Sequence, residues 1–361
     1  MAKTRPVMIM AGGTGGHVFP ALAVARELLS RNIPVVWLGT RKGLEARIVP
    51  AEGIPIEWLS VGGLRGKKMG RLLMAPFMLV VSILQALWIM GRHRPRVVLG
   101  MGGFVTGPGG LAARLTFRPL CIHEQNAIAG LTNRLLARIA HRVFEAFPHS
   151  FAQRRDTQLT GNPVRQEIAA IAPPEQRFLG RTTPLQVLVL GGSLGADAIN
   201  KVLPQALARL TPPWRPRVRH QAGERNLDKA RGYYREAGIE VELSAFINDM
   251  AEAYAWADLV VCRAGALTLA ELAAAGVGAI LIPFPFAVDD HQTANARYFT
   301  QAGAGMLIPQ DQLDADQLAA LIKEFSQDRG RLLQWAQAAR ALAITDSAKQ
   351  VADGCLQLAS N

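Results

Sequence analysis

Cysteine is scarce in this chain of 361 residues, which contains only Cys121, Cys262 and Cys355. The three residues lie far apart and form no CxxC pair, a pattern typical of reduced core residues in a cytosolic protein rather than of a disulfide framework. A long apolar leader is also missing, because glycines interrupt the first apolar stretch, residues 7–11. We therefore expect no signal peptide.

Acidic residues are few in the first half of the chain. Residues 1–165 contain 22 Lys and Arg against 7 Asp and Glu, whereas residues 166–361 contain 18 against 21. The basic half is expected to meet an anionic partner, which could be nucleic acid or an anionic membrane surface. Aromatic side chains that could stack on bases are scarce in this half, so we expect no nucleic-acid partner.

Two common nucleotide-binding motifs are absent from the sequence. A G-x-G-x-x-G fingerprint beginning at Gly13 would need glycine where Val18 stands, and residues 62–68 lack the spacing of a P-loop. Instead, a short apolar strand runs into Gly-Gly-(Thr or Ser) and then a helix, first at residues 7–17 and again at 187–195. Such a turn lets backbone N–H groups approach an anion at the positive end of a helix dipole. Two nucleotide-type domains are therefore predicted.

Apolar stretches alternate with helical patterns, which predicts an α/β protein with doubly wound parallel sheets. In the first half we expect strands near 7–10, 35–39, 56–59, 97–100 and 120–123 and helices near 18–30, 72–90, 109–116 and 130–140. In the second half we expect strands near 186–190, 217–221, 239–244, 258–262, 279–282 and 305–308, with helices between them and at 314–325, 328–343 and 346–358. The length exceeds that of one core, and turn residues from 161 to 184 mark a boundary between two domains.

Leu72–Met90 is a run of 19 residues without a charge, with basic residues on both sides. By length it could cross a bilayer. However, it lies between two expected strands of one sheet, so it could also be an ordinary crossover helix. We favour a crossover helix whose outer apolar face dips into a membrane surface. The residues expected at the membrane are Leu72, Leu79, Trp88, Lys67, Lys68 and Arg71.

Two residues of the Gly-rich turns could carry chemistry. His17 begins a helix, where the dipole favours the neutral imidazole, so it could act as a general base or merely bind an anion. Ser193 stands in a G-x-S-x-G pattern, the nucleophile elbow of hydrolases. A triad would need an Asp and a His on separate later loops, but the acids and the histidine at 289–291 are nearly contiguous. Phosphate binding is therefore the favoured role of Ser193.

A third strand-turn-helix pattern covers residues 262–271. The backbone N–H groups of Gly265 to Thr268 would lie at a helix start and suit a diphosphate, and Glu271 could accept hydrogen bonds from ribose hydroxyls. Alternatively, Glu271 is the capping-box partner of Thr268.

Metal sites are not indicated by the sequence. The polar cluster at 289–295 has ligand residue types but lacks the spacing of a closed site. Asp314 and Asp316 form a D-x-D pair, but its place at an ordinary helix start indicates an N-cap.

Residues 100–107 and 123–126 follow strands at the same sheet edge as the 12–17 turn, and the three segments would line one crevice.

Together, the segments 12–20 (GGTGGHVFP), 123–126 (HEQN), 161–165 (GNPVR), 191–195 (GGSLG) and 262–271 resemble the MurG family, the bacterial UDP-N-acetylglucosamine (UDP-GlcNAc) transferases of peptidoglycan synthesis in glycosyltransferase family 28. The resemblance runs over essentially the whole chain. It implies the GT-B fold, in which two Rossmann-like doubly wound parallel-sheet domains face a central cleft. These would be an acceptor-binding and membrane-associating domain at 1–164, joined by the terminal helix 345–361, and a UDP-GlcNAc-binding domain at 165–344.

The resemblance also implies an inverting hexosyltransferase. It would move GlcNAc from UDP-GlcNAc to the C4 hydroxyl of N-acetylmuramic acid in undecaprenyl-diphospho-MurNAc-pentapeptide (lipid I), giving lipid II. A sugar-nucleotide epimerase of the same fold and an α/β serine hydrolase using Ser193 are the alternatives.

Site residues follow from the resemblance position by position. His17 would be the catalytic base. The donor-binding residues would be Thr14, Gly15, Gly16, Asn126, Arg165, Ser193, Ile247, Ala266, Leu267, Thr268, Leu269, Ala270, Glu271 and Gln292. The acceptor and diphosphate loops would contain Gly12, Gly13, Gly102, Gly103 and Glu124. Ala264 stands where the family often has serine, and Phe286 where it often has a polar residue.

The implied partners are UDP-GlcNAc, lipid I and an anionic membrane surface, and other cell-wall synthesis proteins are left open as further partners. No cofactor and no tightly bound metal are expected. The implied location is peripheral, at the cytoplasmic face of the inner membrane.

Overall fold

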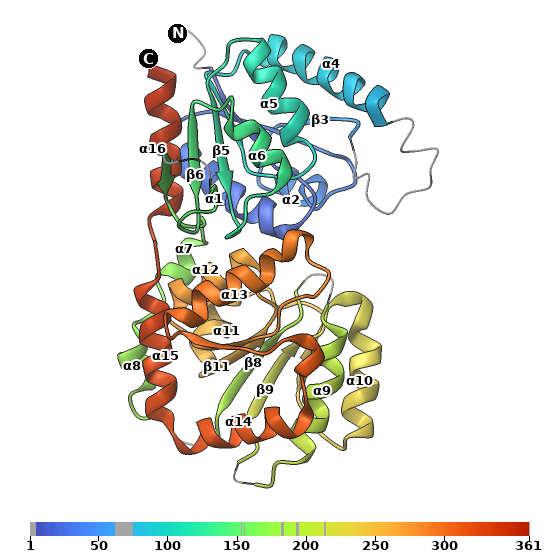
Figure 1. Ribbon diagram of the computed structural model, residues 1–361, viewed down its shortest axis with the longest axis vertical. Coiled ribbons are helices and arrows are strands. Elements are labelled where there is room, and N and C mark those ends of the chain that lie inside the picture. The colour runs from blue at the N-terminus through green and yellow to red at the C-terminus, as the bar shows by residue number, and fades with distance from the viewer. Residues whose placement is uncertain are drawn as a thin grey trace. The chain divides into compact units, whose positions relative to one another are not determined.

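The computed structural model of this chain describes residues 5–61, 75–152, 154, 156–181, 184–192, 195–212 and 214–360. The chain forms two compact units, one made of Met1–Val164 with Asp346–Asn361 and the other of Arg165–Thr345 (Figure 1). Each unit is built around one parallel sheet with helices on its faces. The predicted α/β class with two doubly wound parallel sheets is therefore confirmed.

The N-terminal unit contains a seven-stranded sheet in the order β3-β2-β1-β4-β5-β6-β7, with every pair parallel. Its strands are β1 (Val7–Met10), β2 (Val35–Gly39), β3 (Ile56–Trp58), β4 (Val97–Gly100), β5 (Leu120–Glu124), β6 (Arg142–Glu145) and β7 (Thr157–Leu159). Its helices are α1 (Gly15–Ser30), α2 (Glu45–Ala51), α4 (Ala75–His93), α5 (Thr106–Leu115), α6 (Leu131–Ala137) and α16 (Ser347–Ser360).

Both faces of this sheet are buried at its centre, which explains why β1, β2 and β4 are apolar at every position. In β1, Val7 and Ile9 belong to a core that also contains side chains of α1 and α16. Met8 and Met10 point to the opposite face and belong to a core with α4, α5 and α6. The period-2 alternation of a strand thus places consecutive apolar residues in two different cores.

The C-terminal unit contains a six-stranded parallel sheet in the order β10-β9-β8-β11-β12-β13. Its strands are β8 (Gln186–Leu190), β9 (Arg217–Gln221), β10 (Glu242–Ser244), β11 (Leu259–Cys262), β12 (Ala279–Leu281) and β13 (Gly305–Leu307). Its α-helices are α7 (Gln166–Ala169), α8 (Pro174–Phe178), α9 (Asp197–Ala208), α10 (Leu227–Glu236), α11 (Met250–Trp256), α12 (Ala266–Ala275), α13 (His291–Gln301), α14 (Ala315–Gln327) and α15 (Arg329–Ala341). Short 3-10 turns lie at Glu224–Asn226, Val288–Asp290 and Gln310–Gln312.

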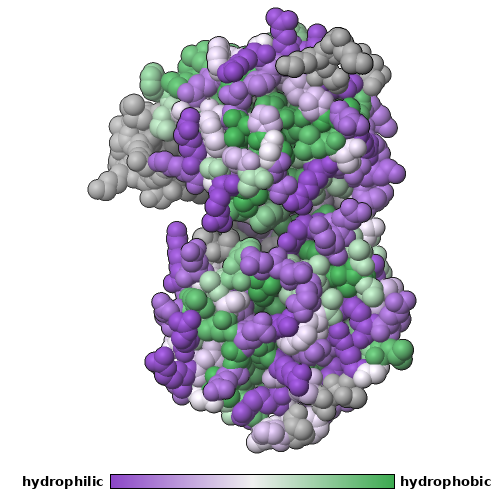
Figure 2. Space-filling view, turned by 180° about the vertical axis from the view of Figure 1, so that it is seen from behind, coloured by the Kyte–Doolittle hydropathy of each residue, from purple (hydrophilic) through white to green (hydrophobic). Residues whose placement is uncertain are grey.

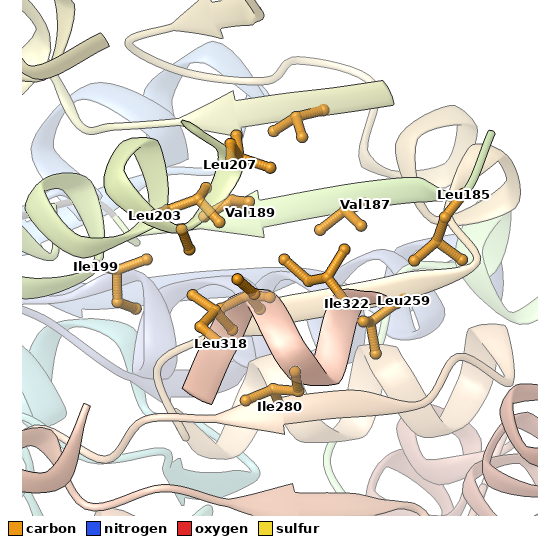
Figure 3. Close-up of a cluster of buried hydrophobic side chains, with 14 of the residues drawn as sticks. Leu185, Val187, Val189, Ile199, Leu203, Leu207, Leu259, Ile280, Leu318 and Ile322 are labelled. Carbon is orange, nitrogen blue, oxygen red and sulfur yellow. The ribbon is translucent and has the colours of Figure 1, made fainter. Parts of the chain in front are cut away.

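The core on one face of this second sheet forms between α9, α14 and the central strands (Figure 3). Leu318 and Ile322 of α14 lie over Val187, Val189 and Ile280, and Leu203 of α9 belongs to the same cluster. Burial of side chains of this size contributes about 1.5–3 kcal/mol each. This core packs on β8, β11 and β12, and the loops after these strands carry the donor-site candidates.

Several expected bounds were wrong. Helix α1 begins at Gly15 rather than near 18, because the glycines themselves form its first turn, and α5 begins at Thr106 rather than near 109. The helix expected at 72–90 is described from Ala75 and ends at His93. Helix α6 ends at Ala137 rather than near 140, and β10 begins at Glu242 rather than near 239.

Helix α2 and strands β6 and β7 were not predicted from the sequence. Helix α2 is only seven residues long, and β7 is a short strand with the sequence TQL at the edge of the sheet. A short edge strand is not buried on both faces, so it lacks the apolar run that identified the inner strands.

The three cysteines are free and buried, as predicted. Cys121 of β5 and Cys355 of α16 lie in the same core of the N-terminal unit, in which α16 packs beside α1. The chain therefore returns to its first unit at its C-terminal end.

Candidate functional site

The first Gly-rich turn of the N-terminal unit joins β1 to α1. Thr14 is the N-cap of α1, with φ −108° and ψ 162°, so Gly15, Gly16 and His17 form the first helical turn. The first N–H groups of a helix have no acceptor within it, and Gly13, Thr14 and Gly16 are exposed. The turn has the geometry of an anion site at a helix N-terminus.

Glu45 holds this turn in place. Its buried carboxylate lies at the start of α2, where Oε2 accepts a hydrogen bond from the Gly13 N–H at 2.9 Å. Its Oε1 accepts from the N–H and the hydroxyl of Thr40, both at 2.8 Å. Glu45 was missed by the sequence analysis because α2 was not expected. An acid shortly after the glycine of a βα turn was the only available signal.

The loop after β4 packs against the same turn. Gly102 and Gly103 have φ of +98° and +85°, and a Cβ on Gly103 would collide with the carbonyl oxygen of Gly12. A Cβ on Gly102 would lie 2.5 Å from Nδ1 of His17. Glycine is therefore required at both positions, and the structure brings the Gly12–Gly13 and Gly102–Gly103 segments together beside the His17 imidazole.

Glu124, at the end of β5, uses its carboxylate to shape its own loop. Oε1 accepts hydrogen bonds from the N–H and the side-chain amide of Asn126 at 2.9 and 3.1 Å. Oε2 accepts from the Gly130 N–H at 3.1 Å and from the Asn133 amide at 2.8 Å. Glu124 is buried, so its carboxylate positions Asn126 and the loop around it.

His17 is held by Gln125, which was expected to line the crevice but was not predicted to contact His17. Nδ1 of its half-buried imidazole lies 3.0 Å from Oε1 of Gln125. Gln125 is buried, and its Nε2 donates to the Met101 carbonyl at 2.9 Å. The ends of β1, β4 and β5 thus meet at His17.

In the C-terminal unit, the second Gly-rich turn follows β8. Gly192 and Gly195 have φ of +76° and +74°, and the Gly195 N–H donates to the Gly192 carbonyl at 3.0 Å. The Gly191 N–H donates to the Gln221 carbonyl at 3.0 Å, which attaches the turn to the end of β9. Ser193 lies outside the described residues, so its contact with phosphate stays a prediction.

The third turn joins β11 to α12. Gly265 is the N-cap, with an extended backbone, and Ala266, Leu267 and Thr268 form the first helical turn. The helix axis thus begins where a diphosphate was predicted to bind, and Leu269 and Ala270 continue it.

The hydrogen-bond partners of Glu271 are not those of a capping-box residue. Because the N-cap is Gly265 and not Thr268, a capping box between Thr268 and Glu271 is wrong. Glu271 Oε1 accepts from Arg165 Nη2 at 3.0 Å, and Oε2 accepts from the hydroxyl of Tyr254 at 3.1 Å. Burial raises the pKa of Glu271, and the Arg165 guanidinium opposes this. Burial also raises the pKa of Tyr254 well above its usual range, so this phenol is a neutral donor.

Gln292, in the first turn of α13, is tied to the loop after β12. Its Oε1 accepts from the Phe284 N–H at 2.9 Å. Arg263 donates to the carbonyls of Ile282 and Pro283 at 3.1 and 3.2 Å and lies over the Phe284 ring. Ile247, in the loop after β10, is half-buried. The loops after β11 and β12 are therefore joined by Arg263, which sequence analysis had not singled out.

The predicted N-cap at Asp314 is confirmed, since its carboxylate accepts from the N–H groups of Asp316 and Gln317 at 2.8 and 3.0 Å. Among the described residues, no group of three or more His, Cys, Asp or Glu could hold a metal ion.

An apolar face is exposed on the N-terminal unit, where α4 packs beside α5 and α5 beside α6 (Figure 2, green at the upper left for α4). Its exposed residues are Phe77, Leu79, Val80, Leu84, Trp88, Leu111, Leu115, Phe117, Leu131 and Leu135. Exposed arginines border it at Arg92, Arg94, Arg134 and Arg138. The predicted membrane residues Leu72, Lys67, Lys68 and Arg71 lie outside the described residues.

Pro76–His93 is long and apolar enough to cross a membrane by length and composition. However, Ala86, Ile89 and Met90 of the same helix are buried in the core beneath it. Helix α4 therefore has one face in the protein core and another that is exposed.

Both units match one family of known proteins. Residues 7–145 match the glycosyltransferase family 28 N-terminal domain, and residues 186–351 match the C-terminal domain of the same family.

Two relatives bear the same name, UDP-N-acetylglucosamine–N-acetylmuramyl-(pentapeptide) pyrophosphoryl-undecaprenol N-acetylglucosamine transferase. The protein of Alkalilimnicola ehrlichii is 59% identical to this chain over 98% of the chain and 99% of the relative. The protein of Marinobacter nauticus is 54% identical over 99% of the chain and 98% of the relative. The crystal structure of Acinetobacter baumannii MurG superposes with a TM-score of 0.84 at 40% identity, covering 98% of this chain and 99% of that one.

Proposed function

This chain belongs to glycosyltransferase family 28, and from that membership we propose that it transfers GlcNAc from UDP-GlcNAc to the C4 hydroxyl of MurNAc in lipid I, giving lipid II. The observation that carries the proposal is the extent of the likeness. Relatives named for this reaction are more than half identical over nearly their whole length.

The proposed donor site lies in the C-terminal unit. The first turn of α12, from Ala266 to Thr268, would bind the diphosphate of UDP-GlcNAc, and Glu271 would hold the ribose. Arg165 uses one terminal nitrogen on Glu271, so it would stand between the ribose and the diphosphate. Ile247, Gln292, Leu269, Ala270 and Ser193 would complete the site, with Gln292 near the sugar.

The proposed chemistry needs stabilisation of a leaving diphosphate. When the bond between the sugar C1 and the β-phosphate oxygen breaks, UDP departs with the electron pair and gains negative charge. The positive end of the α12 dipole and the Arg165 guanidinium would stabilise that negative charge. Attack by the acceptor oxygen from the opposite face of C1 gives inversion.

His17 is the proposed general base. It would accept the proton of the C4 hydroxyl as that oxygen bonds to C1. The glycine segments at 12–13 and 102–103, of which Gly102 lies against the imidazole, would hold the acceptor diphosphate. The first turn of α1, with Thr14, Gly15 and Gly16, would face the reacting groups, and Asn126 would lie beside them.

The apolar face of α4, α5 and α6 is proposed to bring the protein to its lipid-linked acceptor, as a peripheral protein at the cytoplasmic face of the inner membrane. Its bordering arginines complement anionic lipid headgroups. A spanning role would remove Ala86, Ile89 and Met90 from the core in which they are buried, and this argues for surface association.

The test is transfer of labelled GlcNAc from UDP-GlcNAc to a lipid I analogue, with the anomeric configuration of the product read by NMR. A product whose configuration is opposite to that of the donor supports the proposal. Conversion of UDP-GlcNAc without an acceptor would identify an epimerase, and covalent labelling of Ser193 by a fluorophosphonate would identify a hydrolase. Either of these results would replace the proposal.

A further inference from the structure

Two backbone carbonyls fix the direction of a hydrogen-bond chain that ends at His17. A carbonyl oxygen can only accept. The group of Gln125 that lies 2.9 Å from the Met101 carbonyl must therefore be the amide nitrogen Nε2. This leaves the amide oxygen Oε1 facing Nδ1 of His17 at 3.0 Å. The orientation of the Gln125 amide thus follows from the Met101 carbonyl alone.

A second arm of the chain agrees with this orientation. Nε2 of the buried His123 lies 2.9 Å from the Gly161 carbonyl and must donate to it. Burial lowers the pKa of His123 to about 4, so near neutral pH its ring has a single N–H, and Nδ1 is an acceptor. Gln125 Nε2 lies 3.2 Å from that Nδ1. An amide nitrogen on this side of Gln125 therefore satisfies both the Met101 carbonyl and His123.

These hydrogen bonds determine which nitrogen of His17 carries a proton. Because Oε1 of Gln125 accepts, Nδ1 of His17 must donate. The neutral imidazole then has its lone pair on Nε2, the nitrogen that can accept a proton from a substrate. Resting on the function proposed above, we propose that Gln125 is a positioning residue, which holds His17 in the Nδ1–H tautomer with Nε2 presented to the acceptor hydroxyl.

The arrangement explains why an amide suits position 125. A carboxylate could accept from His17 but would face the Met101 carbonyl with a second acceptor. An amide supplies the acceptor for His17 and the donor for Met101 and His123 in one side chain. During the reaction the hydroxyl proton moves to Nε2 of His17, while the proton on Nδ1 stays in its hydrogen bond to Gln125.

Further hydrogen bonds support His123 and Gln125 on the side away from His17. The Gly161 backbone carbonyl accepts from the Ser347 hydroxyl at 2.9 Å. The Asn162 side-chain amide donates to the backbone carbonyl of Gln125 at 2.9 Å. Ser347 begins α16 and both residues are buried. The Gln125 amide that sets the His17 tautomer is therefore oriented by the Met101 carbonyl after β4 and by His123 of β5, and it is supported by the 161–162 segment and α16, all within the N-terminal unit.

NMR of the full-length protein with ¹⁵N-labelled histidine tests the tautomer directly. We expect the neutral His17 ring to show a protonated Nδ1 and an unprotonated Nε2. In Gln125→Leu, which removes both the acceptor and the donor, the opposite tautomer should become populated. A wild-type His17 that is protonated on Nε2 would overturn the proposal, whether or not the protein transfers GlcNAc.

Turnover separates positioning from mere support of the loop. We expect Gln125→Leu to lower kcat roughly 10- to 100-fold, part of what a positioned base supplies, with an unchanged KM for UDP-GlcNAc. Gln125→Glu keeps an oxygen toward His17 while losing the amide donor, so it should retain the Nδ1–H tautomer and lose less activity than Gln125→Leu. Gln158→Leu, on the exposed edge strand β7, is the matched control and should behave as wild type.

Equal loss of kcat in Gln125→Leu and Gln125→Glu, with an unchanged His17 tautomer in both, would reduce Gln125 to a structural support and overturn the proposal. Thermal unfolding and UDP-GlcNAc binding establish that each variant is folded. If the wild type transfers no GlcNAc, the proposed function fails, and the tautomer measurement still judges the role of Gln125.

Discussion

Arg165 Nη2 donates a hydrogen bond to Glu271 Oε1 at 3.0 Å, although the two residues are 106 positions apart in the chain. Both were expected at the donor site, but for different groups, the diphosphate and the ribose. As an ion pair they act together, because Glu271 orients the guanidinium and Arg165 favours the charged carboxylate that burial disfavours.

Replacing Glu271 should therefore affect donor binding more than the chemical step. We expect Glu271→Gln to raise the KM for UDP-GlcNAc roughly 10- to 100-fold, the size expected for hydrogen bonds to a charged group, with a smaller change in kcat. Steady-state kinetics measure both. Glu252→Gln, which breaks the Arg219–Glu252 pair elsewhere in the same unit, is the matched control. A normal donor KM in Glu271→Gln would count against the ribose assignment.

Replacing His17 should affect the chemical step and spare donor binding. We expect His17→Asn to lower kcat about 10²- to 10⁴-fold, since Asn can still donate to Gln125 but has no lone pair in place of Nε2. Calorimetric titration should give an unchanged Kd for UDP-GlcNAc. His149→Asn, at an exposed position of the same unit, should leave turnover unchanged. Normal turnover in His17→Asn would remove His17 as the base.

Charges placed on the apolar face should release the protein from membranes. We expect anionic liposomes to retain the wild type in co-sedimentation and to release a Leu79→Asp/Trp88→Asp variant, because both side chains are about half exposed or more on α4. Retention of the wild type should fall with salt, as screening weakens the attraction of the bordering arginines. Leu179→Asp, at an exposed position of the C-terminal unit, is the control. Equal retention of the variant and the wild type would disprove membrane association through this face.

Acid should destabilise the C-terminal unit through His220. This buried imidazole lies 2.7 Å from the Tyr234 hydroxyl and 3.0 Å from Asn200 Oδ1, and burial lowers its pKa to about 3 from an ordinary 6.5. Between these pH values the unfolded chain binds a proton that the folded chain does not. The free energy of unfolding is therefore unaffected by His220 above about pH 6.5. Between about pH 6.5 and pH 3 it falls by about 1.4 kcal/mol for each pH unit.

Differential scanning calorimetry at pH 7 and pH 5 tests this expectation with His220→Gln. The variant keeps hydrogen-bonding groups but cannot be protonated in this range, so its Tm should fall less between the two pH values than that of the wild type. The same fall in both proteins would show that His220 does not contribute to the acid sensitivity.

The inner strands and the positions of the βα turns could be predicted from the sequence, because strands buried on both faces need continuous apolar runs and sharp turns need glycine. Helix α2 and strand β7 could not, since neither has such a pattern. As a result Glu45, which holds the first Gly-rich turn from α2, was missed, whereas the Asp314 N-cap could be identified from local spacing alone.

The sequence by itself determined the fold class, the family and the three turns where anions are proposed to bind, because these depend on local patterns of apolar residues and glycines. The tertiary structure alone decided which side chains meet across those turns. Glu271 has Arg165 and Tyr254 as partners instead of Thr268, and His17 has Gln125. Such pairs are set by the packing of strands and helices far apart in the chain, since a hydrogen bond depends on where side chains end in space and not on their spacing in sequence.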